Sequence, residues 1–250
     1  MDIRPEQIIW SADVTPEELR DVVRAEALPV GTVIKLDRLY FEKYGKDSIT
    51  YCQERGYPVF ADAKIAEIPD KVIGITKTYL YYKPWMLNVM AGICSTLKLE
   101  DENPKKIDAL KRFADACAEV ETKSCAVTVL TSKTAETCQL EFGSEPIDQV
   151  MWYVDQMCAC GLTDIVCSPQ EASKIRSITT YDKLLINTPG VRLPTSDAND
   201  QARIATPLSA LKNGSDRLVI GRDLTGSRED GPIVERIKRN YAKIMANLKE

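Results

Sequence analysis

The stretch VFADAKIAEIPDKV, residues 59–72, places a short apolar run directly before a group of charged side chains. The apolar run has the length and composition of a buried strand, and a helical pattern begins at the proline that follows. Asp62, Lys64 and Glu67 lie between the two. Because residues two apart in a strand share a face, we expect Asp62 and Lys64 to point the same way. The stretch therefore predicts a buried strand that carries charge at its carboxyl end.

Apolar runs of this length recur along the 250-residue chain, and amphipathic segments separate them. The expected strands begin at Ile8, Thr32, Pro58, Met86, Cys125, Thr163, Leu184 and Arg217. The helical segments carry start signals, such as Thr15 as an N-cap with Pro16 after it. Strand–helix alternation repeated eight times predicts an α/β fold, a (β/α)8 TIM barrel that forms one domain over residues 1–250. An open doubly wound sheet is the competing arrangement, but no G-x-G-x-x-G turn follows the first expected strand.

The composition limits the chemistry. No histidine occurs, which excludes Ser-His-Asp and Cys-His catalysis and the usual zinc sites. Acid–base chemistry must therefore come from Lys, Asp, Glu, Tyr or Cys. The eight cysteines form no C-x-x-C pair, so we expect reduced thiols that serve as small apolar residues.

The charge pattern and hydropathy indicate which partners to expect. The net charge of −4 gives no reason to expect a nucleic acid, and the basic residues are too scattered for a membrane-binding patch. No apolar stretch reaches the length of a membrane span, and the first residues lack the apolar run of a signal peptide. We expect a cytoplasmic protein that does not associate with membranes.

Polar residues end most of the expected strands, and in barrels of this kind the catalytic groups come from the carboxyl ends of strands. These residues are Asp13, Lys35, Asp37, Asp62, Lys64, Thr131, Ser132, Ser168 and Arg222. A salt bridge that merely caps the barrel is the alternative for Asp62 and Lys64. Because Lys35 ends the neighbouring strand, an aspartate and two lysines are expected to meet at one mouth, which favours a functional site.

A second group of residues is typical of a phosphate site. The segment GVRLPTSDANDQARIA, residues 190–205, is long and polar, as functional lids are, with disorder as the alternative. The last strand ends in Ile-Gly-Arg, where Gly221 allows a ligand to approach the backbone and Arg222 can fork onto a phosphate. A salt bridge at the rim is the alternative for Arg222.

Five motifs follow the expected strands in order: DAKIAEIP at 62–69, AVTVLTS at 126–132, TPGVRLP at 188–194, DQARIATP at 200–207 and RLVIGRDLT at 217–225. In order and placement they resemble those of the orotidine 5'-phosphate decarboxylase family, over essentially the whole chain. The resemblance implies cofactor-free and metal-free decarboxylation of orotidine 5'-phosphate to uridine 5'-phosphate (UMP) in pyrimidine biosynthesis, by a homodimer.

The resemblance also implies a role for each matching residue. Lys64 would donate the proton to the pyrimidine carbon that loses carbon dioxide, Asp62 would lie against the departing carboxylate, and Lys35 would brace the charged row. Glu67 would enter from the partner subunit, although the acid at the start of a helix has a purely structural alternative role. The implied substrate-binding residues are Asp13 at the ribose, Thr131 and Ser132 at the pyrimidine, Gln201, Gly221 and Arg222 at the phosphate with Arg192 in support, and Ile68, Lys71 and Pro189.

The sequence departs from the family pattern at three positions. Glu67 replaces an aspartate, Lys71 stands where a threonine commonly contacts ribose, and Met90 stands where a histidine is often found. Lys71 is equally compatible with an exposed helix position. Two rival functions remain open: a metal-dependent phosphosugar decarboxylase or synthase of the same superfamily, and a non-catalytic nucleotide-binding paralogue. The metal-dependent relatives carry an acid where Lys35 stands, which argues against the first rival.

Overall fold

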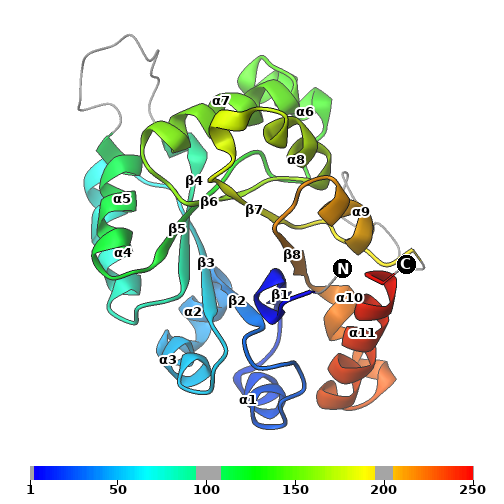
Figure 1. Ribbon diagram of the computed structural model, residues 1–250. Coiled ribbons are helices and arrows are strands. Elements are labelled where there is room, and N and C mark those ends of the chain that lie inside the picture. The colour runs from blue at the N-terminus through cyan, green and yellow to red at the C-terminus, as the bar shows by residue number, and fades with distance from the viewer. Residues whose placement is uncertain (1–2, 94–107, 195–204, 250) are drawn as a thin grey trace.

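Parallel strands close into a barrel in the computed structural model, which describes residues 3–93, 108–194 and 205–249 (Figure 1). Each strand pairs with the next along the chain, and the last pairs with the first. The strands are β1 (Ile8–Ser11), β2 (Val33–Asp37), β3 (Val59–Ile65), β4 (Met86–Met90), β5 (Lys123–Val127), β6 (Asp164–Val166), β7 (Leu185–Thr188) and β8 (Arg217–Ile220). The predicted (β/α)8 barrel is confirmed. The fifth strand ends earlier than its apolar run, so Thr131 and Ser132 lie in the following loop.

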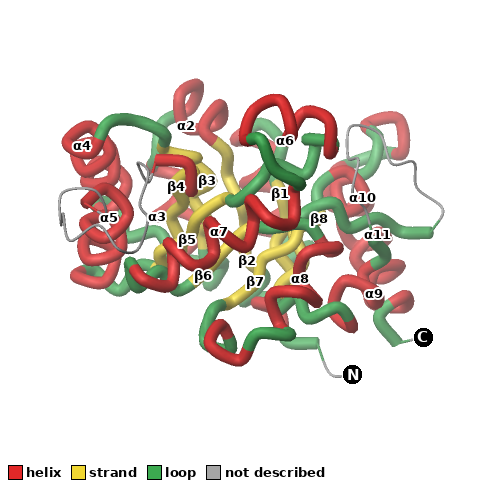
Figure 2. The backbone as a smooth tube through the Cα atoms, turned by 90° about the horizontal axis from the view of Figure 1, so that it is seen from above, coloured by secondary structure: helices red, strands yellow, loops and turns green. Residues whose placement is uncertain are grey.

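Helices surround the barrel and cover its outer face, as the view from above shows (Figure 2). They are α1 (Pro16–Arg24), α2 (Arg38–Tyr44), α3 (Asp47–Gln53), α4 (Pro69–Leu80), α5 (Asp108–Glu119), α6 (Ala135–Phe142), α7 (Pro146–Ala159), α8 (Pro169–Arg176), α9 (Pro207–Lys212), α10 (Arg222–Thr225) and α11 (Ile233–Asn247). Short 3-10 turns cover Pro5–Gln7, Ala91–Ile93, Thr179–Tyr181 and Arg228–Asp230. None of the helices in the described ranges is long and apolar enough to cross a bilayer.

Local side-chain contacts explain where several helices begin. At α1, the Thr15 hydroxyl accepts a hydrogen bond from the Glu18 amide, and the Glu18 carboxylate accepts one from the Thr15 amide. This capping box satisfies two amides that have no partner within the helix. Thr206 caps α9 with a single bond of this kind, in which its hydroxyl accepts from the amide of Ser209. The predicted N-cap at Thr15 is confirmed.

Alternation along the strands divides the core into two layers. Ile8 and Trp10 face outward into the layer between barrel and helices, whereas Ile9 faces the barrel interior. The interior residues are Ile9, Val33, Phe60, Met86, Cys125 and Val219. Their packed side chains fill the middle of the barrel, so the polar groups at its two ends form separate sites.

A buried ionic network closes the amino-terminal end of the barrel. Asp164 is inaccessible to solvent and accepts hydrogen bonds from the guanidinium of Arg217 and, at 3.2 Å, from Nδ2 of Asn187. The Arg217 guanidinium also lies 4.9 Å from the centre of the Trp85 ring. The network joins the first residues of β6 and β8 through β7, so it fixes the strands relative to one another.

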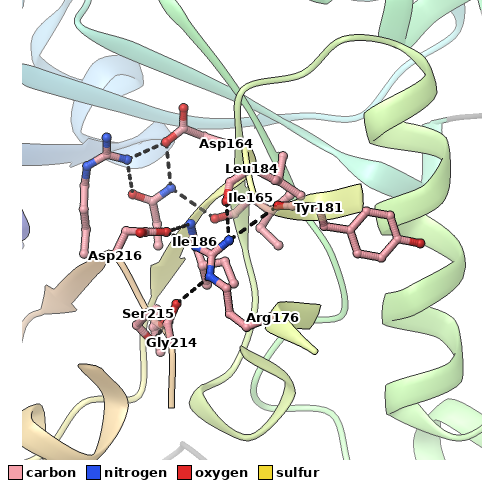
Figure 3. Close-up of polar contacts among 12 residues, drawn as sticks. Asp164, Ile165, Arg176, Tyr181, Leu184, Ile186, Gly214, Ser215 and Asp216 are labelled. Carbon is pink, nitrogen blue, oxygen red and sulfur yellow. Dashed lines mark hydrogen bonds and ion pairs between the residues drawn. The ribbon is translucent and has the colours of Figure 1, made fainter. Parts of the chain in front are cut away.

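A second arginine ties α8 to the same end of the barrel (Figure 3). Arg176 donates to the carbonyl oxygens of Gly214 at 3.0 Å and Leu184 at 2.8 Å, and it pairs with the carboxylate of Asp216. Asp216 in turn accepts from the amide of Ile186 at 2.7 Å. These bonds satisfy backbone groups in the segments that lead into β7 and β8, which gives this end of the barrel a structural role.

Asp164→Ala is expected to destabilise the protein strongly, because it leaves Arg217 buried without its counter-charge. Removal of one partner from a buried ion pair costs roughly 3–5 kcal/mol. The matched control is Asp115→Ala, which removes an exposed acid paired with Lys111 on α5 and should change stability by less than about 1 kcal/mol. Urea unfolding followed by tryptophan fluorescence measures both. Similar losses for the two variants would contradict a special role for the buried network.

Candidate functional site

A cavity of about 530 Å³ opens at the carboxyl ends of the strands. Its lining includes these predicted site residues: Asp13, Lys35, Asp62, Lys64, Thr131, Ser132, Pro189, Arg192, Gly221 and Arg222. They come from six segments that are far apart in the sequence. The parallel barrel brings them together because the carboxyl ends of its strands all lie on one face.

The floor of the cavity holds one carboxylate between two ammonium groups. Oδ2 of Asp62 lies 2.6 Å from Nζ of Lys35 and 2.7 Å from Nζ of Lys64. Asp62 and Lys35 are almost fully buried, whereas the Lys64 side chain is 41% exposed. Lys64 is therefore the member of this array that is most accessible from the cavity.

The backbone at Lys64 departs from regular strand geometry. Its φ of 43° is in the left-handed region, which non-glycine residues rarely adopt. The pairing of β3 with β4 shifts here, because Ala61 pairs with Leu87 but Ile65 pairs with Val89. The expectation that Asp62 and Lys64 point the same way is confirmed, because both line the cavity while Ala61, Ala63 and Ile65 pack in the outer layer. The bulge and the left-handed backbone of Lys64 were not expected.

Asn88 of β4 lies opposite this bulge and bonds to both sides of it. Its Nδ2 donates to Oδ1 of Asp62 at 2.7 Å, and its Oδ1 accepts from the backbone amide of Lys64 at 2.7 Å. The sequence interpretation did not include Asn88. The available signal was a single polar residue within the apolar run MLNVM, residues 86–90.

Opposing effects set the charge of the array. Burial raises the pKa of Asp62, but the charges of Lys35 and Lys64 outweigh burial and hold this pKa well below its usual range. Burial lowers the pKa of Lys35, but Asp62, with smaller effects from Asp13 and Asp37, raises it above its ordinary value. Burial also raises the pKa of Asp13, and the charge of Lys35 partly offsets that rise. Asp62 is thus an anion and Lys35 a cation at neutral pH.

The lining of the cavity also includes Gly221 and Arg222, at the junction of β8 and α10. A Cβ on Gly221 would lie 3.5 Å from Cβ of Ser11, an ordinary contact, so packing within the protein does not demand glycine. This leaves close approach by a ligand as a reason for the residue. Arg222 is exposed at the rim. Ser11 and Phe60 also line the cavity and were not among the predicted residues.

The loop after β7 is anchored beside this junction. Arg192 is buried and lies 3.3 Å from Oδ1 of Asp223, while the amide of Leu193 donates to Oδ2 of Asp223 at 2.6 Å. The two ends of the predicted lid meet where the Arg192 amide donates to the carbonyl of Ala205 at 2.9 Å. Residues 195–204, which include the predicted phosphate contact Gln201, lie outside the described residues.

Three predicted site residues do not line the cavity of their own chain. Glu67, Ile68 and Lys71 are exposed at the start of α4, beyond the end of β3. Ile68 is 65% exposed, and Leu39 at the start of α2 is 72% exposed. The pKa of Arg38 is raised mainly by its bond to Glu42, and the charge of Glu67 adds a smaller contribution. Leu39 and Ile68 follow closely after β2 and β3, two strands that line the cavity, and we call the exposed starts of α2 and α4 the α2–α4 surface.

Comparisons with known proteins find sequence matches over most of the chain. The model of the orotidine 5'-phosphate decarboxylase / HUMPS family matches residues 6–237. An orotidine 5'-phosphate decarboxylase from Actinobacillus pleuropneumoniae serotype 5b is 31% identical over 205 residues, which are 82% of this chain and 85% of that protein. One from Nitrosospira multiformis is 31% identical over 212 residues, 84% of this chain and 83% of that protein.

The fold also resembles solved structures. The crystal structure of an orotidine 5'-phosphate decarboxylase from Lactobacillus acidophilus superimposes with a TM-score of 0.74, and the match covers 97% of this chain and 99% of that one. At 23% sequence identity this likeness supports the barrel fold alone.

The lowered pKa of Asp62 gives the stability a defined pH dependence. An acid whose folded-state pKa is depressed stabilises the fold fully above its unfolded pKa, about 3.9, and loses that contribution as the pH falls. Wild type should therefore be more stable than Asp62→Asn at pH 7. Below about pH 4 the difference should shrink by up to about 1.4 kcal/mol per pH unit. Urea titrations between pH 7 and pH 3 measure it, with Asp115→Asn on the exposed face of α5 as the control. A difference that does not change with pH would contradict this assignment.

Proposed function

The chain belongs to the orotidine 5'-phosphate decarboxylase / HUMPS family, and on that premise we propose that it converts orotidine 5'-phosphate and a proton into UMP and carbon dioxide. The reaction is a step of pyrimidine biosynthesis. The observation that carries the proposal is the buried carboxylate of Asp62 between the ammonium groups of Lys35 and Lys64, at 2.6 and 2.7 Å. This array combines a fixed anion with a proton donor in a cavity of suitable size for a nucleotide.

This reaction needs a positive charge near the carbon that becomes negative and a proton donor for that carbon, and the array supplies both. When the carbon–carbon bond to the carboxylate breaks, the electron pair stays on the pyrimidine carbon. The ammonium group of Lys64 stabilises that developing charge and then transfers a proton to the carbon. Because this interaction is stronger with the carbanion than with the bound substrate, it lowers the barrier. Lys64 regains its proton from solvent after product release.

Asp62 acts on the substrate carboxylate. Its lowered pKa keeps it ionised, so the carboxylate that leaves as carbon dioxide would be bound beside a like charge. This repulsion disappears as neutral carbon dioxide forms, which favours the transition state over the bound substrate. Lys35 holds the Asp62 carboxylate in place. Its buried ammonium group bonds to the same carboxylate oxygen that Lys64 contacts.

The remaining cavity residues would position the nucleotide. We assign Asp13 to the ribose hydroxyls, Thr131, Ser132 and Pro189 to the pyrimidine, and Gly221, Arg222, Arg192 and Gln201 to the phosphate end. The ordinary spacing around Gly221 supports this orientation, since a phosphate oxygen can reach the backbone there. The buried pair of Arg192 with Asp223 supports a role for Arg192 in anchoring the loop rather than in direct contact.

An ultraviolet assay of orotidine 5'-phosphate loss, with a chelator present, tests the proposed activity. We expect turnover, because both charged partners of Asp62 are lysines and the array needs no metal ion. Lys64→Ala should reduce kcat at least about 100-fold, the scale of a lost general acid, while calorimetry shows UMP binding largely unchanged. Lys111→Ala, on the exposed face of α5, is the control and should keep full activity. Turnover only without chelator would favour the metal-dependent rival, and UMP binding without turnover would favour a nucleotide-binding protein.

We also propose that the chain works as a homodimer whose partner supplies Glu67. The α2–α4 surface supports this, because it exposes the large apolar side chains of Leu39 and Ile68 shortly after two strands that line the cavity. Exposed apolar patches next to a site are typical of subunit interfaces. Within one chain Glu67 is exposed and does not line the cavity, so it is available to a neighbouring copy. A twofold axis at this surface would place each Glu67 near the cavity of the other subunit.

A cytoplasmic location stays a prediction of the sequence.

Subunit mixing tests the shared site. Lys64→Ala and Glu67→Ala should each be nearly inactive as separate proteins. In a mixed dimer one site carries both substitutions, and the other site is intact. After equal mixing and random exchange half of the dimers are mixed, so roughly a quarter of all sites should recover activity. If exchange is demonstrated by mass spectrometry and activity stays at the level of the separate variants, Glu67 acts within its own chain.

A further inference from the structure

Asn88 contacts the reacting array without lining the cavity. It is the central residue of β4, is inaccessible to solvent, and is the one polar residue of that strand. Its amide bonds to Asp62 on one side and to the backbone of Lys64 on the other. Because Asn88 does not face the cavity, it can influence the reaction only through these two residues.

The contact with Asp62 fixes how the carboxylate is turned. Oδ1 accepts from Asn88 at 2.7 Å, and Oδ2 accepts from both lysines. A carboxylate rotates freely about its last bond unless both oxygens are held, because that torsion is broad. The Asn88 amide therefore determines which oxygen is presented to the ammonium group of Lys64.

The contact with Lys64 holds its backbone in an unfavourable conformation. A left-handed conformation costs a non-glycine residue about 1–3 kcal/mol and persists only where surrounding contacts impose it. Between the pairs Ala61–Leu87 and Ile65–Val89, the bulge of β3 spans three residues and β4 supplies only Asn88. The side-chain oxygen of Asn88 accepts the Lys64 amide, which the shifted ladder leaves without a strand partner.

We propose that Asn88 is a positioning residue for the decarboxylation, which sets the carboxylate of Asp62 and the backbone of Lys64 with one amide group. This inference rests on the proposed function. The chemistry demands an amide here, because the side chain must donate to a carboxylate and accept from a backbone N–H at once. An aliphatic residue provides neither bond. An ionised aspartate accepts from Lys64 but places a second carboxylate against Asp62.

A contribution to stability alone is the rival explanation, and the chain offers a matched control for it. Asn187 is also fully buried in a strand, and its Nδ2 also donates to a buried aspartate, Asp164, which pairs with a cation, Arg217. It lies beside Asp164 and Arg217, the first residues of β6 and β8, at the opposite end of the barrel. Both asparagines are thus buried and donate to a buried aspartate, but Oδ1 of Asn187 accepts from Arg217 and not from a backbone amide of the Asp62 array.

The experiment compares Asn88→Ala and Asn88→Asp with Asn187→Ala and Asn187→Asp, and kcat is taken per UMP-binding site so that unfolded protein is not counted. Misplacement of a catalytic group by about 1 Å costs on the order of 100-fold in rate, so we expect kcat of the Asn88 variants to fall by about that factor. UMP affinity and KM should change by less than about threefold, because nucleotide contacts are intact. The Asn187 variants should lose thermal stability but keep the wild-type kcat.

The outcomes separate the two proposals. Absence of turnover in wild type refutes the decarboxylase function itself. Wild-type turnover together with unchanged kcat in a folded Asn88 variant refutes only the role of Asn88. An equal loss of kcat in the Asn88 and Asn187 variants also refutes it, because the effect would then follow from lost stability. Asn88→Asp has nearly the volume of asparagine, so it keeps the test available if the alanine variant does not fold.

Discussion

The carboxylate of Asp62 is the group around which the mouth of the barrel is organised. A buried carboxylate is costly unless it is paired and hydrogen-bonded. Here one oxygen is shared by two ammonium groups and the other is bonded to an amide. These contacts bring together side chains from β2, β3 and β4, so the charge imposes a definite arrangement on three neighbouring strands. Removal of Asp62 itself would leave the buried ammonium group of Lys35 without this counter-charge.

The two ends of the barrel hold buried charges for different purposes. At the amino-terminal end the carboxylate of Asp164 contacts Arg217 and Asn187 and is inaccessible to solvent. At the carboxyl end the equivalent pairing of Asp62 with Lys35 opens onto a cavity through Lys64. The apolar interior layer separates the two networks. The same pairing of charges therefore stabilises the fold at one end and can act on a ligand at the other.

The sequence predicts the barrel and the membership of its cavity well, because both follow from periodic patterns. Strand-length apolar runs alternating with helices indicate eight strand–helix units, and parallel strands must place their carboxyl ends on one face. The left-handed backbone of Lys64 and the contacts of Asn88 were not predictable in this way. They depend on how β3 and β4 pair, and a single sequence does not reveal the register between neighbouring strands. The outward position of Glu67, Ile68 and Lys71 likewise depends on the direction in which the chain leaves β3.

The bulge in β3 adds an even number of residues to the strand, and this number decides how the residues after the bulge pack. From Ala61 to Ile65 the chain advances four residues while β4 advances two, from Leu87 to Val89. The surplus is an even number, so alternation between the inner and outer faces resumes in phase, and Ile65 packs in the outer layer just as Ala61 does. A surplus of one residue would have turned every later side chain to the wrong face. An even insertion lets a strand add a residue at the mouth of the barrel while the hydrophobic pattern on either side of it is preserved.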